Sequence, residues 1–198
     1  MDKITVKFVD IGDIKWKDLR KLPFITREDY VKADGYKTED DKIARLISAY
    51  LKRKYVGIWQ VGVNGKPVAA GKFFNVSHTK GAVVFVASDG DVGVDIEKTR
   101  PVSGKLKRYV ATDEEYAYIK DDMTFFEIWT AKESLAKAAG FGVVSRAETI
   151  PALPLDGKKR FNGAEFFSRC VKTEDYVISV ARKGSPFDVV IENETLPL

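Results

Sequence analysis

Alternating apolar and polar residues predict several strands and two long helices. Residues 4–11 alternate with a period of two, as expected for a strand with one buried face. The composition also predicts strands at residues 58–63, 82–87, 92–97, 143–150, 161–171, 176–182 and 188–191. Asn64-Gly65 predicts a turn after the first of these, an Asp-Gly loop joins the strands at 82–87 and 92–97, and residues 151–159 predict a loop.

The helix signals divide the chain into two halves of similar content. Thr38 is a predicted N-cap for a helix that ends before Gly57, and a second helix covers residues 124–139 until Gly140. Thr112 and Glu115 form a predicted capping box. Residues 98–104 have the composition of a connector, so we expect an α+β fold with lobes at residues 1–98 and 99–198.

The 198-residue composition excludes several kinds of site. A single cysteine, Cys170, rules out internal disulfides, and one histidine, His78, rules out zinc sites with several Cys and His ligands. A Ser-His-Asp hydrolase would have to use His78. The chain has neither a secretory h-region nor an apolar run near the ~20 residues of a membrane span, so we expect a soluble cytoplasmic protein.

Charge is distributed unevenly along the chain. The formal net charge of +4 lies within residues 1–98, and residues 42–88 contain no acidic residue. The basic residues of that stretch are Lys42, Arg45, Lys52, Arg53, Lys54, Lys66, Lys72 and Lys80. A carboxylate cluster, Asp89, Asp91, Asp95 and Glu97, follows directly. This order predicts a site for a phosphate and a divalent cation, although Lys52 to Lys54 also fit the cation preference of a helix C-terminus.

Three segments carry candidate chemistry. In residues 92–97, VGVDIE, alternation places Asp95 and Glu97 on one face, where they need a cation or a basic partner. In residues 125–140, helical spacing aligns Trp129, Glu133 and Lys137, a stripe that suits a metal site or a surface ion pair. Residues 73–81, FFNVSHTKG, suit either a phosphate-binding loop or a structural histidine.

Together, FNVSH, GVDIE and WTAKESLAK resemble the ordered signature of the 4′-phosphopantetheinyl transferases, of the surfactin-synthetase-activating (Sfp-like) type. The resemblance implies an intramolecular pseudodimer of two similar α+β lobes that works as a monomer. It implies transfer of the phosphopantetheine arm of coenzyme A to a serine of an apo acyl or peptidyl carrier protein. Adenosine 3′,5′-bisphosphate would leave, and neither nucleic acid nor a membrane would be a partner.

The resemblance also implies roles for individual residues. It makes Asp95, Glu97 and Glu133 the ligands of Mg²⁺, with Glu133, Lys137 and Asp95 as the catalytic residues. Glu133 would be the general base and Lys137 would contact the coenzyme A phosphates. The coenzyme-binding residues would be Lys66, Pro67, Ser77, His78, Arg45, Lys42, Lys132 and Lys137, with His78 at the 3′-phosphate. By this division, residues 1–98 would hold the coenzyme and 99–198 the catalytic helix and carrier-docking surface.

Some choices stay open from the sequence. The upstream cation at the 3′-phosphate could be Lys32, Lys42 or Arg45, with Arg45 preferred, and either Glu114 or Glu115 could join the site. The rival hypotheses are a Mg²⁺-dependent nuclease or phosphodiesterase and a non-catalytic homologue that binds coenzyme A or a carrier. Nucleases of that kind commonly place a lysine two residues after a carboxylate, whereas Lys98 directly follows Glu97 and points to the opposite face.

Overall fold

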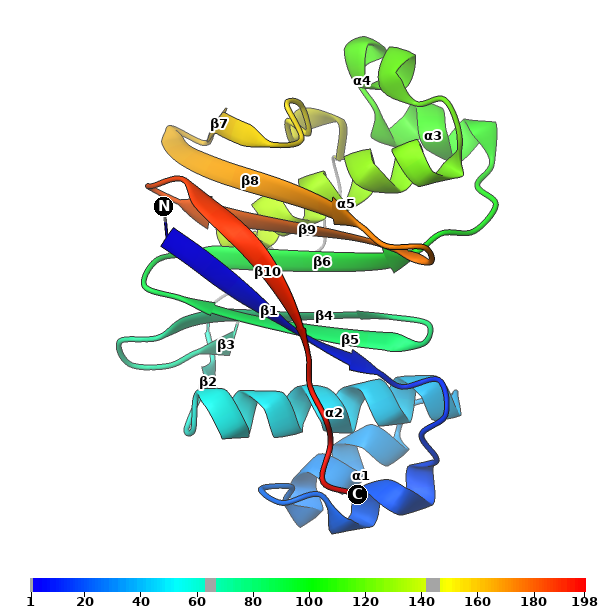
Figure 1. Cartoon of the computed structure of the whole chain (residues 1–198), viewed down its shortest axis with the longest axis vertical. Coiled ribbons are helices and arrows are strands. Elements are labelled where there is room, and N and C mark those ends of the chain that lie inside the picture. The colour runs from blue at the N-terminus through cyan, green and yellow to red at the C-terminus, as the bar shows by residue number, and fades with distance from the viewer. Residues whose placement is uncertain (1, 63–66, 142–146) are drawn as a thin grey trace.

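The fold consists of two four-stranded sheets stacked face to face, each covered by one long helix (Figure 1). The computed structural model describes residues 2–62, 67–141 and 147–198. The first sheet has the order β10-β1-β5-β4 and the second the order β6-β9-β8-β7. The strands of the first sheet are β1 (Asp2–Asp10), β4 (Phe73–Thr79), β5 (Ala82–Ser88) and β10 (Phe187–Asn193). Those of the second are β6 (Val92–Lys98), β7 (Gly157–Phe161), β8 (Ala164–Lys172) and β9 (Tyr176–Lys183).

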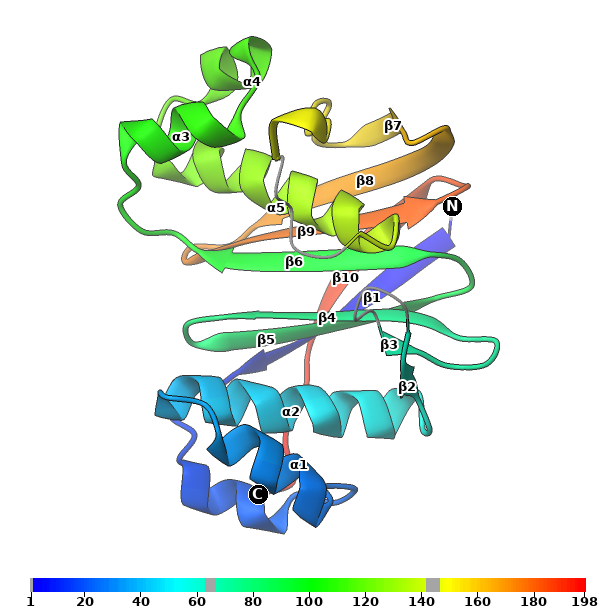
Figure 2. The same ribbon diagram turned by 180° about the vertical axis from the view of Figure 1, so that it is seen from behind.

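Two long helices cover the outer faces of the sheets (Figure 2). Helix α2 (Glu39–Tyr55) packs on the first sheet, and α5 (Asp122–Ala138) packs on the second. Thr38 caps α2 by accepting a hydrogen bond from the Asp41 amide, so the predicted N-terminus is confirmed. The shorter helices are η1 (Trp16–Lys21), α1 (Arg27–Asp34), α3 (Gly104–Val110), α4 (Asp113–Tyr118) and η3 (Ala147–Thr149), and β2 (Gln60–Val61) pairs with β3 (Pro67–Val68).

The core between the sheets consists mainly of β-branched residues from both halves of the chain. Val84 and Val86 from the first sheet pack with Val94 and Val180 from the second. Alternation in β6 sends Val92, Val94 and Ile96 into this core, which leaves the other face of the strand to α5. The register of β6 is therefore fixed by burial.

The two sheets do not correspond to the two halves of the chain, because each sheet contains one strand from the other half. Strand β6, before residue 98, pairs with β9 in the second sheet. Strand β10 returns to the first sheet and pairs in parallel with β1, with Asp2 opposite Phe187 and Phe8 opposite Asn193. The α+β class is as expected, but sheet membership does not change at residues 98 and 99.

Several local predictions need correction. Residues 147–149 of the predicted strand at 143–150 form the 3₁₀ helix η3, and residues 143–146 lie outside the described part. Residues 157–172 form a hairpin of two strands where we predicted a loop and one strand. The turn falls at Asn162-Gly163, where both residues have positive φ. Of the predicted strand at 58–63, only residues 60–61 are a described strand, and Val63 and the Asn64-Gly65 turn are not described.

Within residues 2–62, 67–141 and 147–198, no helix combines the length and the apolar character that crossing a membrane requires.

Candidate active site at the junction of the two sheets

Gly93 lets helix α5 lie directly against strand β6. A Cβ atom at Gly93 would be 2.2 Å from the Ser134 carbonyl oxygen and 2.4 Å from the Ala138 amide nitrogen. Only glycine permits this approach, because both clashing atoms belong to the helix backbone. The contact brings the stripe of α5 that carries Glu133 and Lys137 over the carboxylate face of β6.

Lys137 and Asp95 form the centre of this site. The Lys137 Nζ atom lies 2.6 Å from Asp95 Oδ1, and it also donates to Ser77 Oγ at 3.0 Å. Ser77 Oγ in turn donates to the same Asp95 oxygen at 2.8 Å. Ser77 and Lys137, from the first and third motifs, therefore meet at the carboxylate of Asp95, from the second.

The second oxygen of Asp95, Oδ2, is buried and accepts no hydrogen bond from the described residues. A buried carboxylate oxygen without a donor is costly, so such an atom calls for a further partner. A divalent cation is the kind of partner that fits an oxygen of this charge.

Polar side chains of β4 connect the two sheets at this point. Asn75 Oδ1 accepts from the Val94 amide at 3.1 Å, and Thr79 Oγ1 donates to Glu97 Oε2 at 3.1 Å. With Ser77, these residues occupy alternate positions of β4, so one face of this edge strand binds β6 along its length. The junction fixes β4 relative to the carboxylates.

Glu133 and Glu97 complete the carboxylate set. Burial, followed by the negative charge of Asp95, raises the pKa of Glu133, while Lys137 acts in the opposite direction. Glu97 is held by Thr79 and by Arg100, whose Nη1 lies 2.8 Å from Glu97 Oε2. Among the described residues, no three metal-ligating side chains converge into a ready metal site. The orphaned oxygen of Asp95 fits a metal ligand, whereas its other oxygen is occupied by Lys137.

A cavity of 270 Å³ lies between α2 and β4 and gathers other predicted residues. Its lining includes Arg45, Pro67 and His78, to which the family resemblance gives a role in coenzyme binding. Desolvation by surrounding atoms lowers the pKa of His78, so its imidazole is neutral at pH 7 in the ligand-free protein, while Asp41 opposes this effect. His78 and Ser77 occupy opposite faces of β4, which joins the cavity to the Asp95 site.

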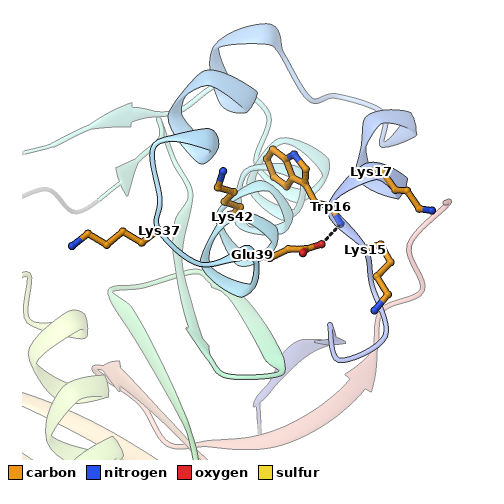
Figure 3. A pocket seen from close by; sticks show the side chains of 6 residues that line it. All are labelled: Lys15, Trp16, Lys17, Lys37, Glu39 and Lys42. Carbon is orange, nitrogen blue, oxygen red and sulfur yellow. Dashed lines mark hydrogen bonds between the residues drawn. The ribbon is translucent and has the colours of Figure 1, made fainter.

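Lys42 lies apart from this cavity. It lines a separate pocket of 600 Å³ with Lys15, Trp16, Lys17, Lys37 and Glu39 (Figure 3). There its ammonium pairs with Asp34 at 2.6 Å and lies over the Trp16 ring. Lys32 is also engaged elsewhere, in an ion pair with Glu28 at 2.7 Å. Of the three upstream candidates, only Arg45 lines the cavity with His78, and Lys66 lies outside the described residues.

Lys132 must be removed from the candidate coenzyme-binding residues. Its side chain is fully buried, with Nζ 2.7 Å from Glu115 Oε2 and donating to the carbonyls of Ala147 and Ile150. Glu115 accepts from the Thr112 and Ala152 amides as well. This pair joins α4 and α5 to the segment after α5, so both residues have structural roles.

Comparison with known proteins agrees with this geometry. The sequence profile of the 4′-phosphopantetheinyl transferase superfamily matches residues 91–181, which include β6 and α5. The chain is therefore similar to members of the 4′-phosphopantetheinyl transferase superfamily. The 4′-phosphopantetheinyl transferase psf-1 of Bacillus pumilus is 26% identical over 176 residues, 78% of this chain and 76% of the relative.

Two further relatives match shorter regions of the chain at higher identity. The 4′-phosphopantetheinyl transferase Sfp of Bacillus subtilis (strain 168) is 34% identical over 89 residues, 42% of this chain and 36% of that protein. The transferase gsp of Aneurinibacillus migulanus is 36% identical over 76 residues, 35% of this chain and 32% of the relative. These two alignments thus span about a third of the relatives. The resemblance to the Sfp-like type is confirmed by these relatives.

Sequence reasoning missed two residues that shape the cavity, Ser48 and Lys52. Both lie on the buried side of α2. In the sequence, Ser48 is typical of a small residue within a helix, and Lys52 is typical of a cation near a helix C-terminus. The absence of acidic residues between 42 and 88 was the available signal.

Proposed function

We propose that this protein transfers the 4′-phosphopantetheine moiety of coenzyme A to a serine of an apo acyl or peptidyl carrier protein. The observation that carries the proposal is the convergence of Ser77 and Lys137 on the buried carboxylate of Asp95, beside Glu133. The superfamily relationship gives the reaction class. The products would be the holo carrier and adenosine 3′,5′-bisphosphate.

Each step of this reaction can be assigned to a residue of the candidate site. Glu133 accepts the proton of the carrier serine, because its raised pKa makes it a stronger base than an ordinary carboxylate. The serine oxygen attacks the phosphorus that bears the pantetheine arm, and the bond from that phosphorus to the bridging oxygen breaks. Lys137 stabilises the negative charge that forms on the leaving oxygen. To do so, it exchanges part of its contact with Asp95 for the diphosphate.

We propose that Mg²⁺ is held by Asp95, Glu97 and Glu133. The orphaned Oδ2 of Asp95 supports this assignment, and carboxylate oxygens are the ligands that Mg²⁺ prefers. A bound Mg²⁺ would neutralise the charge of the diphosphate. The chain's own contribution is to keep the three carboxylates and Lys137 on facing elements, β6 and α5.

We propose that coenzyme A occupies the side of β4 that carries His78 and Arg45, with its diphosphate near Ser77 and Lys137. In this arrangement, residues 1–98 bind the coenzyme and residues 99–198 contribute the catalytic helix and carrier docking, as two lobes of a pseudodimer that exchange β6 and β10. The protein would act as a cytoplasmic monomer. The nuclease alternative is disfavoured because Lys98 turns to Asp175, 3.5 Å away.

The test is a mass measurement of several apo carriers after incubation with the protein, coenzyme A and Mg²⁺. One phosphopantetheine per carrier is expected, and chelation by EDTA should abolish the transfer. Glu133→Gln should remove turnover while calorimetry still detects coenzyme A binding. An unchanged mass across all carriers would refute the function, and full turnover by the Glu133 variant would refute its role as the base.

A further inference from the structure

The cavity between α2 and β4 contains a buried lysine that the proposed reaction does not use. Lys52 is 5% exposed, and its Nζ lies 4.1 Å from the centre of the Trp59 ring. Figure 2 shows the C-terminal end of α2 beside β2. Trp59 directly precedes β2, and Pro67 belongs to its partner strand β3. An aromatic face compensates an ammonium only in part.

The charge of Lys52 lacks a paired carboxylate among the residues that the structure describes. Asp29, the acid that favours its charged form, pairs with Arg53 at 2.9 Å. Burial, and then the neighbouring Arg45, lower the pKa of Lys52 to about 8. Buried cations normally have a counter-charge, so an isolated one that lines a cavity indicates an anionic ligand.

Ser48 gives a second, independent indication. It lies one turn before Lys52 on α2 and lines the same cavity. The residue is only 6% exposed, and its buried hydroxyl has no hydrogen-bond partner among the described residues. Native structures rarely leave such a donor unused, so a ligand atom within the cavity would satisfy it.

The remaining lining completes the chemistry of the ligand. Arg45 and His78 add two more nitrogen donors, and the described lining contains no carboxylate. Tyr36, Trp59 and Pro67 supply apolar surface beside these donors. The volume of 270 Å³ is below the roughly 300–1,000 Å³ of typical whole-ligand pockets, so the cavity suits one end of a longer molecule.

We propose that Lys52 and Ser48 bind the 3′-phosphate of coenzyme A and make the protein select the 3′-phosphorylated nucleotide over its dephospho form. This inference rests on the proposed function. Two upstream lysines that could have supplied the charge, Lys32 and Lys42, are paired with Glu28 and Asp34. Lys52, on the cavity-facing side of α2, supplies the cation for the phosphate instead.

The experiment compares Lys52→Met and Ser48→Ala with the wild type by isothermal titration calorimetry. The probes are coenzyme A against 3′-dephospho-coenzyme A, and adenosine 3′,5′-bisphosphate against adenosine 5′-monophosphate. Lys52→Met should weaken the 3′-phosphorylated ligands by about tenfold or more, as expected for a lost charge-assisted hydrogen bond, and leave the others nearly unchanged. Ser48→Ala should act in the same direction by a smaller factor.

Stability separates ligand binding from a structural role. Removing an unpaired buried charge or hydroxyl should hold or raise the unfolding temperature, so affinity and stability should move in opposite directions. Lys54→Met is the matched control, because Lys54 lies on the same helix outside the cavity and pairs with Glu194. It should keep the wild-type preference for the 3′-phosphate.

Two outcomes overturn the inference: wild-type protein without a preference for the 3′-phosphorylated ligands, or a preference that survives in both variants. Equal loss of affinity for all four ligands in the two variants would also overturn it, since Lys52 and Ser48 would then shape the cavity without binding the 3′-phosphate. A preference that depends on Lys52 in a protein that transfers nothing to any carrier would support the inference and refute the proposed function alone.

Discussion

Replacing Gly93 by alanine tests whether the closeness of α5 to β6 positions the site. The added Cβ would lie 2.2 Å from the Ser134 carbonyl oxygen, more than 1 Å short of the roughly 3.5 Å at which such atoms attract each other. The clashing atoms belong to the backbone, so no side-chain rotation can relieve the contact. Helix α5 must therefore move away from β6 by about 1 Å.

This movement should affect both stability and rate. Overpacking of this kind costs about 1–3 kcal/mol, and a clash with two backbone atoms belongs at the upper end of that range. The same shift separates Lys137 and Glu133 from Asp95, and a misplacement of about 1 Å can lower the rate about a hundredfold. Urea unfolding and the rate of holo-carrier formation measure the two effects.

Gly104→Ala provides the matched control, because a Cβ at Gly104 would meet no atom within 4 Å. Its unfolding free energy should stay within about 0.5 kcal/mol of the wild type, with unchanged transfer. The reasoning is refuted if Gly93→Ala matches this control in both stability and rate. A variant that is stable but slow would still agree with a displaced helix.

Three further predictions concern groups outside the candidate site. Lys132→Met should lower the unfolding free energy by about 3–5 kcal/mol, because it leaves the Glu115 carboxylate buried without its partner. Urea unfolding measures this effect, and a change below about 1 kcal/mol would contradict it. Burial raises the pKa of Cys170 to about 11, so iodoacetamide at pH 8 should label it much faster in urea than in the folded protein, and equal rates would disprove its protection. Burial lowers the pKa of Lys159 to about 8, so the unfolded chain binds more protons between pH 8 and the ordinary lysine value. The free energy of unfolding should therefore rise more steeply with pH across that window in the wild type than in Lys159→Met, provided that both unfold reversibly, and equal slopes would contradict this.

Local signals predicted the elements that carry the chemistry. Helices α2 and α5 and strand β6 were found from caps and periodicity, because each encodes its own buried face. The hairpin β7–β8 could have been found from Asn162-Gly163, a common turn dipeptide, but the prolines and glycines before it favoured a loop.

Partners distant in the chain explain the errors. Helical spacing placed Lys132 beside the catalytic stripe, but its contacts come from Glu115 and from carbonyls after the end of α5. Lys42 pairs with Asp34 because α1 packs against α2. A pattern of residue types cannot show which of several lysines meets an acid, because that choice depends on tertiary packing.

The exchange of β6 and β10 has a consequence for dividing this protein. A cut between residues 98 and 99 would leave β6 on a fragment without its partner β9, and β10 on a fragment without β1. Each half would expose unpaired strand edges, which capture other chains. Separately expressed halves should therefore recombine with each other or aggregate. The stretch from β6 to β9 holds the whole second sheet in one continuous segment, whereas a fragment with the complete first sheet would need β10 joined to it in a new order.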